Sequence, residues 1–232
     1  MDFHEYSDTL KVVIFINFKT YEKGTGEEAI SLVKILEGVS DETHAKIIPV
    51  VQATDIKEIV ELTKLEVWAQ NIDPVEEGAH TGAILAEAVK EDGARGTFLN
   101  HSEKKLGSYT LLSKAINRAR DAGLKILVFA ATLKELKEIV GLKPDFVSYE
   151  PPELVGSKDT SVAKEEPGVI KNAVKIAKSA RLPLIVGAGI KSAEDVRISM
   201  NLGAAGIAVA SDVVKAENPK KELLDLIKGF EG

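Results

Sequence analysis

Eight short apolar segments, each followed by a segment with helical periodicity, constrain the fold of this chain most strongly. They are rich in Val and Ile, and most lack alternating polar residues, as expected of strands covered on both faces. The candidate strands are residues 12–17, 46–51, 67–72, 96–100, 125–130, 146–150, 183–190 and 206–211. The helical patterns lie at 26–38, 55–64, 84–92, 109–122, 132–141, 166–179, 192–202 and 217–230.

Eight consecutive strand–helix units without a long insertion predict an α/β fold of the (β/α)₈ barrel type. The chain has 232 residues, 44% of them hydrophobic, and no Pro/Gly/Ser-rich linker divides it. We therefore expect a single domain over residues 1–232, with residues 1–11 as a candidate N-terminal extension. An open doubly wound sheet is the alternative. It would normally carry a glycine-rich turn after the first strand, and "INFKTYEKGTG" does not match GxGxxG.

Composition excludes several classes of function. Thirty basic and 36 acidic residues give a net charge of −6, which argues against a nucleic-acid or anionic-membrane surface. The absence of cysteine excludes a disulfide framework and a thiol nucleophile. The first eleven residues lack the apolar core of a signal peptide, and no run reaches transmembrane length. The sequence predicts a cytoplasmic protein without nucleic-acid or membrane partners.

Polar residues gather where the predicted strands end, which is where (β/α)₈ barrels carry their chemistry. Asn17 and Lys19 follow the first strand on alternate residues and so share one face. The fourth strand runs into "NHSE" at 100–103, and the sixth ends in Glu150. The last two strands lead into the small, Gly/Ser-rich loops "GAGI" and "ASD", each followed by a helix, as suits a phosphate site. We expect a base, an imidazole, a lysine and an anion site to converge on one mouth of the barrel.

Each of these residues also has a purely structural interpretation. His101 can act as a packing or capping residue, Lys19 as a solvated lysine and Glu150 as a turn cap. A glycine after a strand often marks only a tight turn. The functional interpretation is favoured because all four features fall on the same predicted rim.

Seven segments resemble the triosephosphate isomerase family, especially its shorter archaeal form. They are "NFKTY", "AQNIDP", "GAHTG", "LNHSE", "YEPPELVG", "VGAGI" and "VAS…VKAENP", in the family's order from residue 12 to about 219. "NHSE" combined with "EPPEL.G" is the specific part of the match. The resemblance implies interconversion of glyceraldehyde 3-phosphate and dihydroxyacetone phosphate through an enediol(ate), without a cofactor or metal.

The resemblance also implies a role for each polar residue at the rim. Glu150 matches the base that moves a proton between two substrate carbons, and His101 matches the imidazole that polarises the carbonyl. Lys19 matches the cation that holds the substrate, with Asn17 as its neighbouring donor. Glu103 matches the acid that follows the histidine and supports it.

Phosphate binding is implied for three loops. Val155 and Gly156 match a lid whose amide meets the phosphate, and Gly189, Ala210 and Ser211 match backbone donors of the last two loops. A lid of this kind would suppress loss of phosphate from the intermediate. Pro151 and Pro152, directly after the base, would stiffen its hinge.

The chain departs from the family's pattern at three places. Asp212 stands where glycine or alanine is usual, and a carboxylate aimed at the phosphate would be unfavourable. We therefore expect its side chain to cap the following helix or to point away. Residues 157–159 change the tip of the lid, and Ala83 replaces a larger polar residue in the loop after the third strand.

That loop, "DPVEEGAHTG", is the subunit-interface loop of the family. The resemblance implies a homodimer or homotetramer whose contacts involve Gly78, Ala79, His80 and Thr81.

Two other functions stay open at this level. One is a different phosphate-binding barrel isomerase of amino-acid biosynthesis, which would act on phosphoribosyl substrates. The other is a non-enzymatic relative that binds a phosphorylated metabolite or acts as an assembly scaffold, with Asp212 as its inactivating change.

Overall fold

The computed structural model describes residues 13–151, 167–187 and 189–230. Its strands are β1 Val13–Asn17, β2 Lys46–Val51, β3 Trp68–Ala69, β4 Gly96–Leu99, β5 Lys125–Ala130, β6 Phe146–Tyr149, β7 Leu184–Val186 and β8 Gly206–Val209. Its α-helices are α1 Gly26–Thr43, α2 Ile56–Leu62, α3 Ala86–Glu91, α4 Tyr109–Asp121, α5 Leu133–Ile139, α7 Pro167–Ser179, α8 Ala193–Asn201, α9 Ser211–Val214 and α10 Pro219–Ile227.

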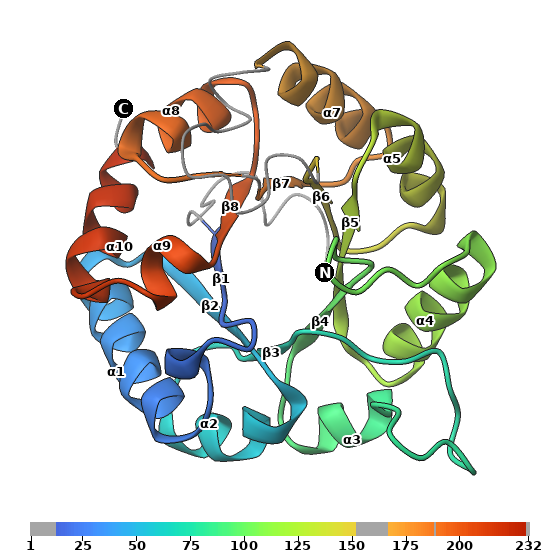
Figure 1. Cartoon of the computed structure of the whole chain (residues 1–232). Helices are drawn as coiled ribbons and strands as arrows, with labels where there is room; N and C mark the ends of the chain where they lie inside the picture. The colour runs from blue at the N-terminus through green and yellow to red at the C-terminus, as the bar shows by residue number, and fades with distance from the viewer. Residues whose placement is uncertain (1–12, 152–166, 188, 231–232) are drawn as a thin grey trace.

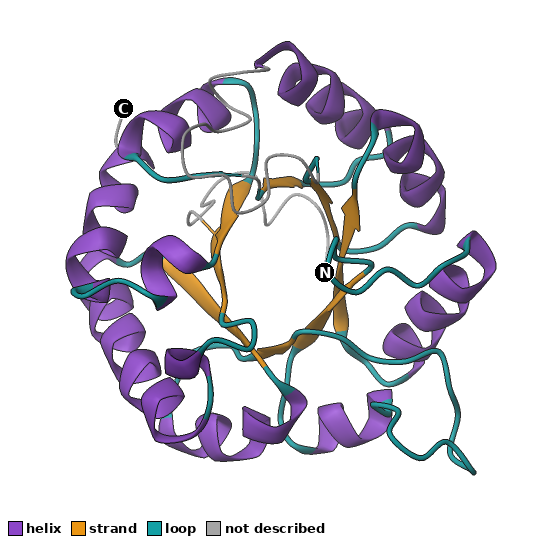
Figure 2. Ribbon diagram, in the orientation of Figure 1, coloured by secondary structure: helices purple, strands orange, loops and turns teal. Residues whose placement is uncertain are grey.

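The strands form a closed parallel barrel. Each pairs with the next in chain order, and β1 also pairs with β8, from Val13 opposite Gly206 to Ile16 opposite Val209. The helices surround the strands as a ring (Figures 1 and 2). The predicted (β/α)₈ barrel is confirmed, and the alternative of an open sheet is wrong. No helix in the described ranges is both long and apolar enough to cross a membrane.

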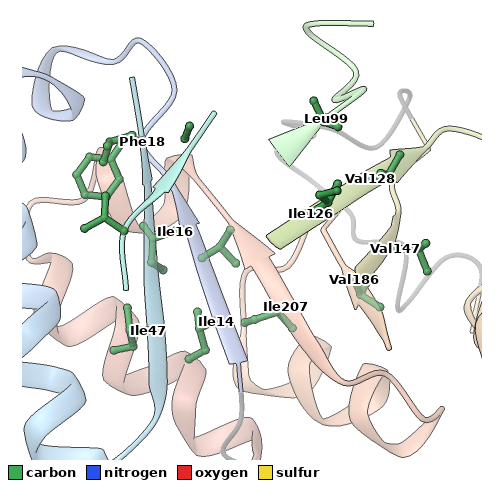
Figure 3. Packing of buried hydrophobic residues seen from close by; sticks show 14 of the residues in the cluster. Ile14, Ile16, Phe18, Ile47, Leu99, Ile126, Val128, Val147, Val186 and Ile207 are labelled. Carbon is green, nitrogen blue, oxygen red and sulfur yellow. The ribbon is translucent and has the colours of Figure 1, made fainter. Parts of the chain in front are cut away.

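Both faces of the strands are apolar because each faces a different core. Ile14 and Ile16 on β1 belong to the layer between the barrel and the helices, together with Ile207 on β8. Figure 3 shows this outer layer. Val13 and Phe15 alternate with them and face the barrel interior. A strand buried on both sides has no solvent-facing positions, which explains the missing polar alternation.

Aromatic rings fill the barrel interior below the mouth. The Phe15 ring lies 5.0 Å from the Trp68 ring and 5.7 Å from the Phe146 ring, both edge to face. Trp68 is fully buried, and a Cβ on Gly96 would lie 2.4 Å from its indole ring. Glycine at position 96 thus makes room for the largest side chain of the core.

The structure corrects several predicted boundaries. β3 and β7 are shorter than the predicted strands 67–72 and 183–190, because the chain leaves the barrel to form the loops around its mouth. α1 continues to Thr43 rather than stopping near Gly38, because the buried Val39 anchors a further turn. The short helix α9 is missing from the sequence-based prediction.

Candidate active site

One cavity opens at the C-terminal end of the barrel, and it brings together most of the residues expected there. Its lining includes Asn17, Lys19, His101, Glu150, Gly189, Ala210 and Ser211. These residues come from β1 and from the loops that follow β1, β4, β6, β7 and β8. Closure of the barrel therefore places side chains more than 130 residues apart around one space. Val155 and Gly156 lie outside the described residues, as do the lid positions 157–159 and the first eleven residues.

Lys19 is held in place by contacts to its own backbone. The Asn17 side chain accepts a hydrogen bond from the Lys19 N–H at 3.0 Å, and Lys19 has a φ of +49°. The Gln70 amide donates to the Lys19 carbonyl oxygen at 2.8 Å. The Lys19 ammonium donates to Glu103 Oε1, also at 2.8 Å. Sequence reasoning missed Gln70, because the predicted strand 67–72 placed it inside the strand and not at the mouth.

The hydrogen-bonding pattern of His101 assigns its protons. The backbone N–H of Glu103 donates to His101 Nδ1 at 3.2 Å, so Nδ1 is an acceptor. In a neutral imidazole the other nitrogen, Nε2, then carries the proton. Burial, with help from the positive charges of Lys19 and Lys105, lowers the His101 pKa from 6.5 to about 4, although Glu103 opposes the shift. The imidazole is therefore neutral at neutral pH and presents Nε2–H as a donor.

Glu150 lies at the end of β6, and its backbone N–H donates to the Ala130 carbonyl at 2.9 Å. Burial raises the pKa of its carboxyl from 4.5 to about 7, against the opposing effect of Lys19. Its Oε2 lies 3.2 Å from His101 Nε2. This oxygen has no hydrogen-bond partner within the described ranges, so the two groups touch without being aligned for a bond. A buried carboxylate with a raised pKa, beside a donor and a cation, is suited to act as a general base.

A second network supports the loop that carries His101. Asn100 adopts a φ of +61°, and its Nδ2 donates to the Phe129 carbonyl at 2.9 Å and to Glu135 Oε1 at 2.7 Å. The other Glu135 oxygen accepts the Ala131 N–H at 2.6 Å, and Lys105 also donates to Glu135. Glu135 was not identified from the sequence, because it lies inside a helical segment far along the chain from Asn100.

The loops after β7 and β8 form the other side of the cavity. Gly189 has a φ of +68°, a conformation that suits glycine, and Ser211 begins α9. The expectation that Asp212 caps the following helix is wrong, because α9 starts at Ser211 and Ala210 occupies the cap position. Asp212 instead lines the cavity and accepts a hydrogen bond from the Ser211 hydroxyl at 3.3 Å.

Metal ligation finds no support in the part of the chain that the structure describes, where no three His, Asp or Glu side chains form a group able to hold an ion. The absence of a metal or cofactor from the reaction stays a prediction.

The loop between β3 and α3 extends outward from the ring of helices (Figure 1). At its base, Asp73 accepts the Ile84 N–H through its side chain at 2.8 Å and donates its own N–H to the Ile84 carbonyl at 2.9 Å. The tip is exposed to solvent over residues 76–83, which include the predicted contact residues Gly78, Ala79, His80 and Thr81. The predicted contact residues are therefore accessible on the surface of the chain.

The chain is similar to known proteins over nearly its whole length. The family model described as "Triosephosphate isomerase" matches residues 12–230. The triosephosphate isomerase of Methanocaldococcus jannaschii is 38% identical over 219 residues, which cover 94% of this chain and 99% of that protein. That of Metallosphaera sedula is 41% identical over 218 residues, covering 94% of this chain and 95% of that protein. That of Sulfurisphaera tokodaii is 43% identical over 216 residues, covering 93% of each. The chain belongs to the triosephosphate isomerase family.

Proposed function

We propose that this protein interconverts glyceraldehyde 3-phosphate and dihydroxyacetone phosphate by proton transfer through an enediol(ate), as a step of glycolysis and gluconeogenesis. The observation that carries the proposal is the contact between Glu150 and His101, 3.2 Å apart, in a cavity that Lys19 also lines. The relatives named above supply the reaction, and the cavity supplies the groups that the reaction needs.

Glu150 is the proposed base. Removal of a proton from a carbon next to a carbonyl needs a group that is ionised before the step and able to return the proton to the neighbouring carbon. A carboxyl with a pKa of about 7 has both forms accessible at neutral pH. Burial also keeps water from the intermediate, which would otherwise be quenched.

His101 and Lys19 stabilise the charge that develops on oxygen. The neutral imidazole directs Nε2–H towards the cavity, so it can polarise the carbonyl and move protons between the two oxygens of the enediol. Lys19 holds the substrate and offsets negative charge, with Asn17 as a neighbouring donor. Glu103 orients both groups, because its backbone N–H binds His101 and its carboxylate binds Lys19.

For the phosphate we propose backbone donors at Gly189, Ala210 and Ser211, all of which line the cavity. Val155 and Gly156 are proposed as the lid that closes over it. These assignments rest on the match to the family's motifs.

We also propose that the protein is a homodimer or homotetramer in contact through Gly78, Ala79, His80 and Thr81, and that it is cytoplasmic. Sedimentation velocity tests the assembly. His80→Asp should shift the protein towards the monomer, because it adds a charge to the exposed tip. The charge reversal Lys57→Asp on α2 serves as the control. A wild-type protein that sediments as a monomer would contradict the proposed assembly.

A coupled assay with glyceraldehyde 3-phosphate tests the reaction. Glu150→Gln removes the base and should lower kcat by about 10²–10⁴-fold. Glu150→Asp withdraws the carboxylate and should cost roughly 10²-fold. Glu61→Gln, an exposed carboxylate on α2, is the matched control and should keep full activity. Equal turnover by wild type and Glu150→Gln would reject the assignment.

A further inference from the structure

Lys191 is a cation of the cavity to which neither the sequence motifs nor the mechanism above gives a role. It follows β7 and lines the same space as Lys19, Gly189 and Ser211. Its Nζ atom is buried, yet it has no hydrogen-bond partner within residues 13–151, 167–187 and 189–230. A buried ammonium without a partner is costly. Its position therefore indicates an anionic partner that occupies the cavity during function.

The backbone around Lys191 is already committed. Asp195 Oδ2 accepts the Lys191 N–H at 3.2 Å, the Ser192 N–H at 3.0 Å and the Ser192 hydroxyl at 2.7 Å. These bonds include one half of the capping box at the start of α8, and the Asp195 N–H, which donates to the Ser192 hydroxyl oxygen at 3.3 Å, supplies the other half. They occupy the backbone donors of residues 191 and 192, so the side chain of Lys191 is the donor left to meet an anion. They also hold its backbone in place.

The charges around the cavity show why a second cation is useful. The Lys19 ammonium already binds Glu103, and Asp212 adds a further carboxylate to the lining. Without Lys191, these three groups carry a net negative charge against an incoming phosphate. Lys191 cancels the charge that Asp212 adds, and the ionised form of Glu150 contributes a further negative charge to the same lining.

We propose that Lys191 binds the phosphate group of the substrate through its ammonium, and that it compensates for the carboxylate of Asp212. The identity of the ligand as a triose phosphate rests on the function proposed above. The phosphate contact itself rests on the buried, unpartnered ammonium and on the cavity that it lines.

Lys191→Met keeps the length of the side chain and removes its charge. The KM for glyceraldehyde 3-phosphate should rise roughly 10- to 100-fold, the range of a lost charge-assisted hydrogen bond. The affinity for inorganic phosphate, measured by calorimetry, should fall by a similar factor. Turnover of D-glyceraldehyde, which has no phosphate, should stay the same. Lys175→Met, on the exposed face of α7, is the matched control.

Two more variants separate charge from packing. Lys191→Arg keeps the charge and should retain most of the phosphate affinity. Asp212→Asn in the Lys191→Met background should restore part of the lost affinity, because it removes the carboxylate that Lys191 offsets. An unchanged phosphate affinity in Lys191→Met, or an equal loss for phosphorylated and unphosphorylated substrates, would overturn the proposal.

The same measurements distinguish failure of the Lys191 proposal from failure of the proposed isomerase function. If inorganic phosphate binds in a Lys191-dependent way while no triose phosphate is isomerised, the isomerase assignment fails and this inference stands. If Glu150-dependent turnover is present but phosphate affinity ignores Lys191, the isomerase assignment stands and this inference fails.

Discussion

His101 Nε2 lies 3.2 Å from Glu150 Oε2, and burial shifts the pKa values of these two side chains in opposite directions. Burial penalises whichever form is charged, so it raises the pKa of the acid and lowers that of the imidazole. At neutral pH the site therefore holds the uncharged His101 imidazole as a donor beside the Glu150 carboxyl, whose pKa is close to the pH.

The first prediction concerns the pH dependence of activity. The rate constant kcat/KM should rise with pH through an inflection near 7, because Glu150 must lose its proton before it can act as a base. His101, with a pKa of about 4, should add no inflection above pH 5.5. Profiles with D-glyceraldehyde exclude ionisation of the substrate phosphate as the cause. An inflection that appears only with phosphorylated substrate would contradict the prediction.

The second prediction concerns stability against pH. Folding raises the Glu150 pKa from 4.5 to about 7, so this residue's stabilisation is full below pH 4.5 and is lost as pH rises to 7. Folding lowers the His101 pKa from 6.5 to about 4, so its contribution is full above pH 6.5 and is lost as pH falls to 4. In the wild type the two trends oppose each other, each amounting to roughly 3 kcal/mol.

Single substitutions should separate these trends. Relative to the wild type, the free energy of unfolding of Glu150→Gln should rise more steeply with pH between 4 and 6.5, because of the two buried groups only His101 then titrates. In His101→Gln the free energy of unfolding should fall between pH 4.5 and pH 7, because Glu150 still titrates. Urea unfolding at several pH values measures both slopes. Parallel curves for the two variants would show that burial does not shift these groups as described.

The third prediction concerns Gly187, which borders the cavity. A Cβ at this position would lie 2.6 Å from Glu150 Oε1, so Gly187→Ala should displace the base. We expect kcat to fall by roughly 10²-fold with little change in KM, because a shift of about 1 Å disturbs the transfer geometry. Gly38→Ala in α1 is the control, since a Cβ there meets nothing within 4 Å. Equal kcat values for the two variants would contradict the expectation.

The fourth prediction concerns Asn100, which directly precedes His101. Its φ of +61° and the hydrogen bonds of its side chain fix the backbone at this point. Asn100→Ala should lower the free energy of unfolding by about 2–4 kcal/mol and reduce kcat, because strain is added and hydrogen bonds are lost. Asn100→Gly should recover the part that is due to strain. Thermal unfolding and steady-state kinetics measure the two effects.

His44 provides the control for backbone strain, because it also has a positive φ, of 58°, but lies at the end of α1. His44→Ala should lose stability while kcat stays unchanged. A loss of kcat as large as that of Asn100→Ala would mean that the effect on catalysis is not local to the His101 loop.

The barrel and the positions of Lys19, His101 and Glu150 on its rim could be predicted from the residue pattern alone. Strand and helix periodicity are local properties, and eight such units leave few arrangements that bury every strand on both faces. Each polar residue directly follows an apolar run, so its place at a strand end could be predicted without coordinates.

Which polar groups meet, and which of them are charged, could not be predicted before the barrel was closed. Gln70 reaches Lys19, and Glu135 reaches Asn100, across gaps of 51 and 35 residues. Asp212 borders the cavity in the first turn of α9, a helix that the residue pattern did not predict. The pKa values of His101 and Glu150 depend on burial by the whole barrel. Contacts of this kind follow from closure of the sheet, which joins residues that no local pattern relates.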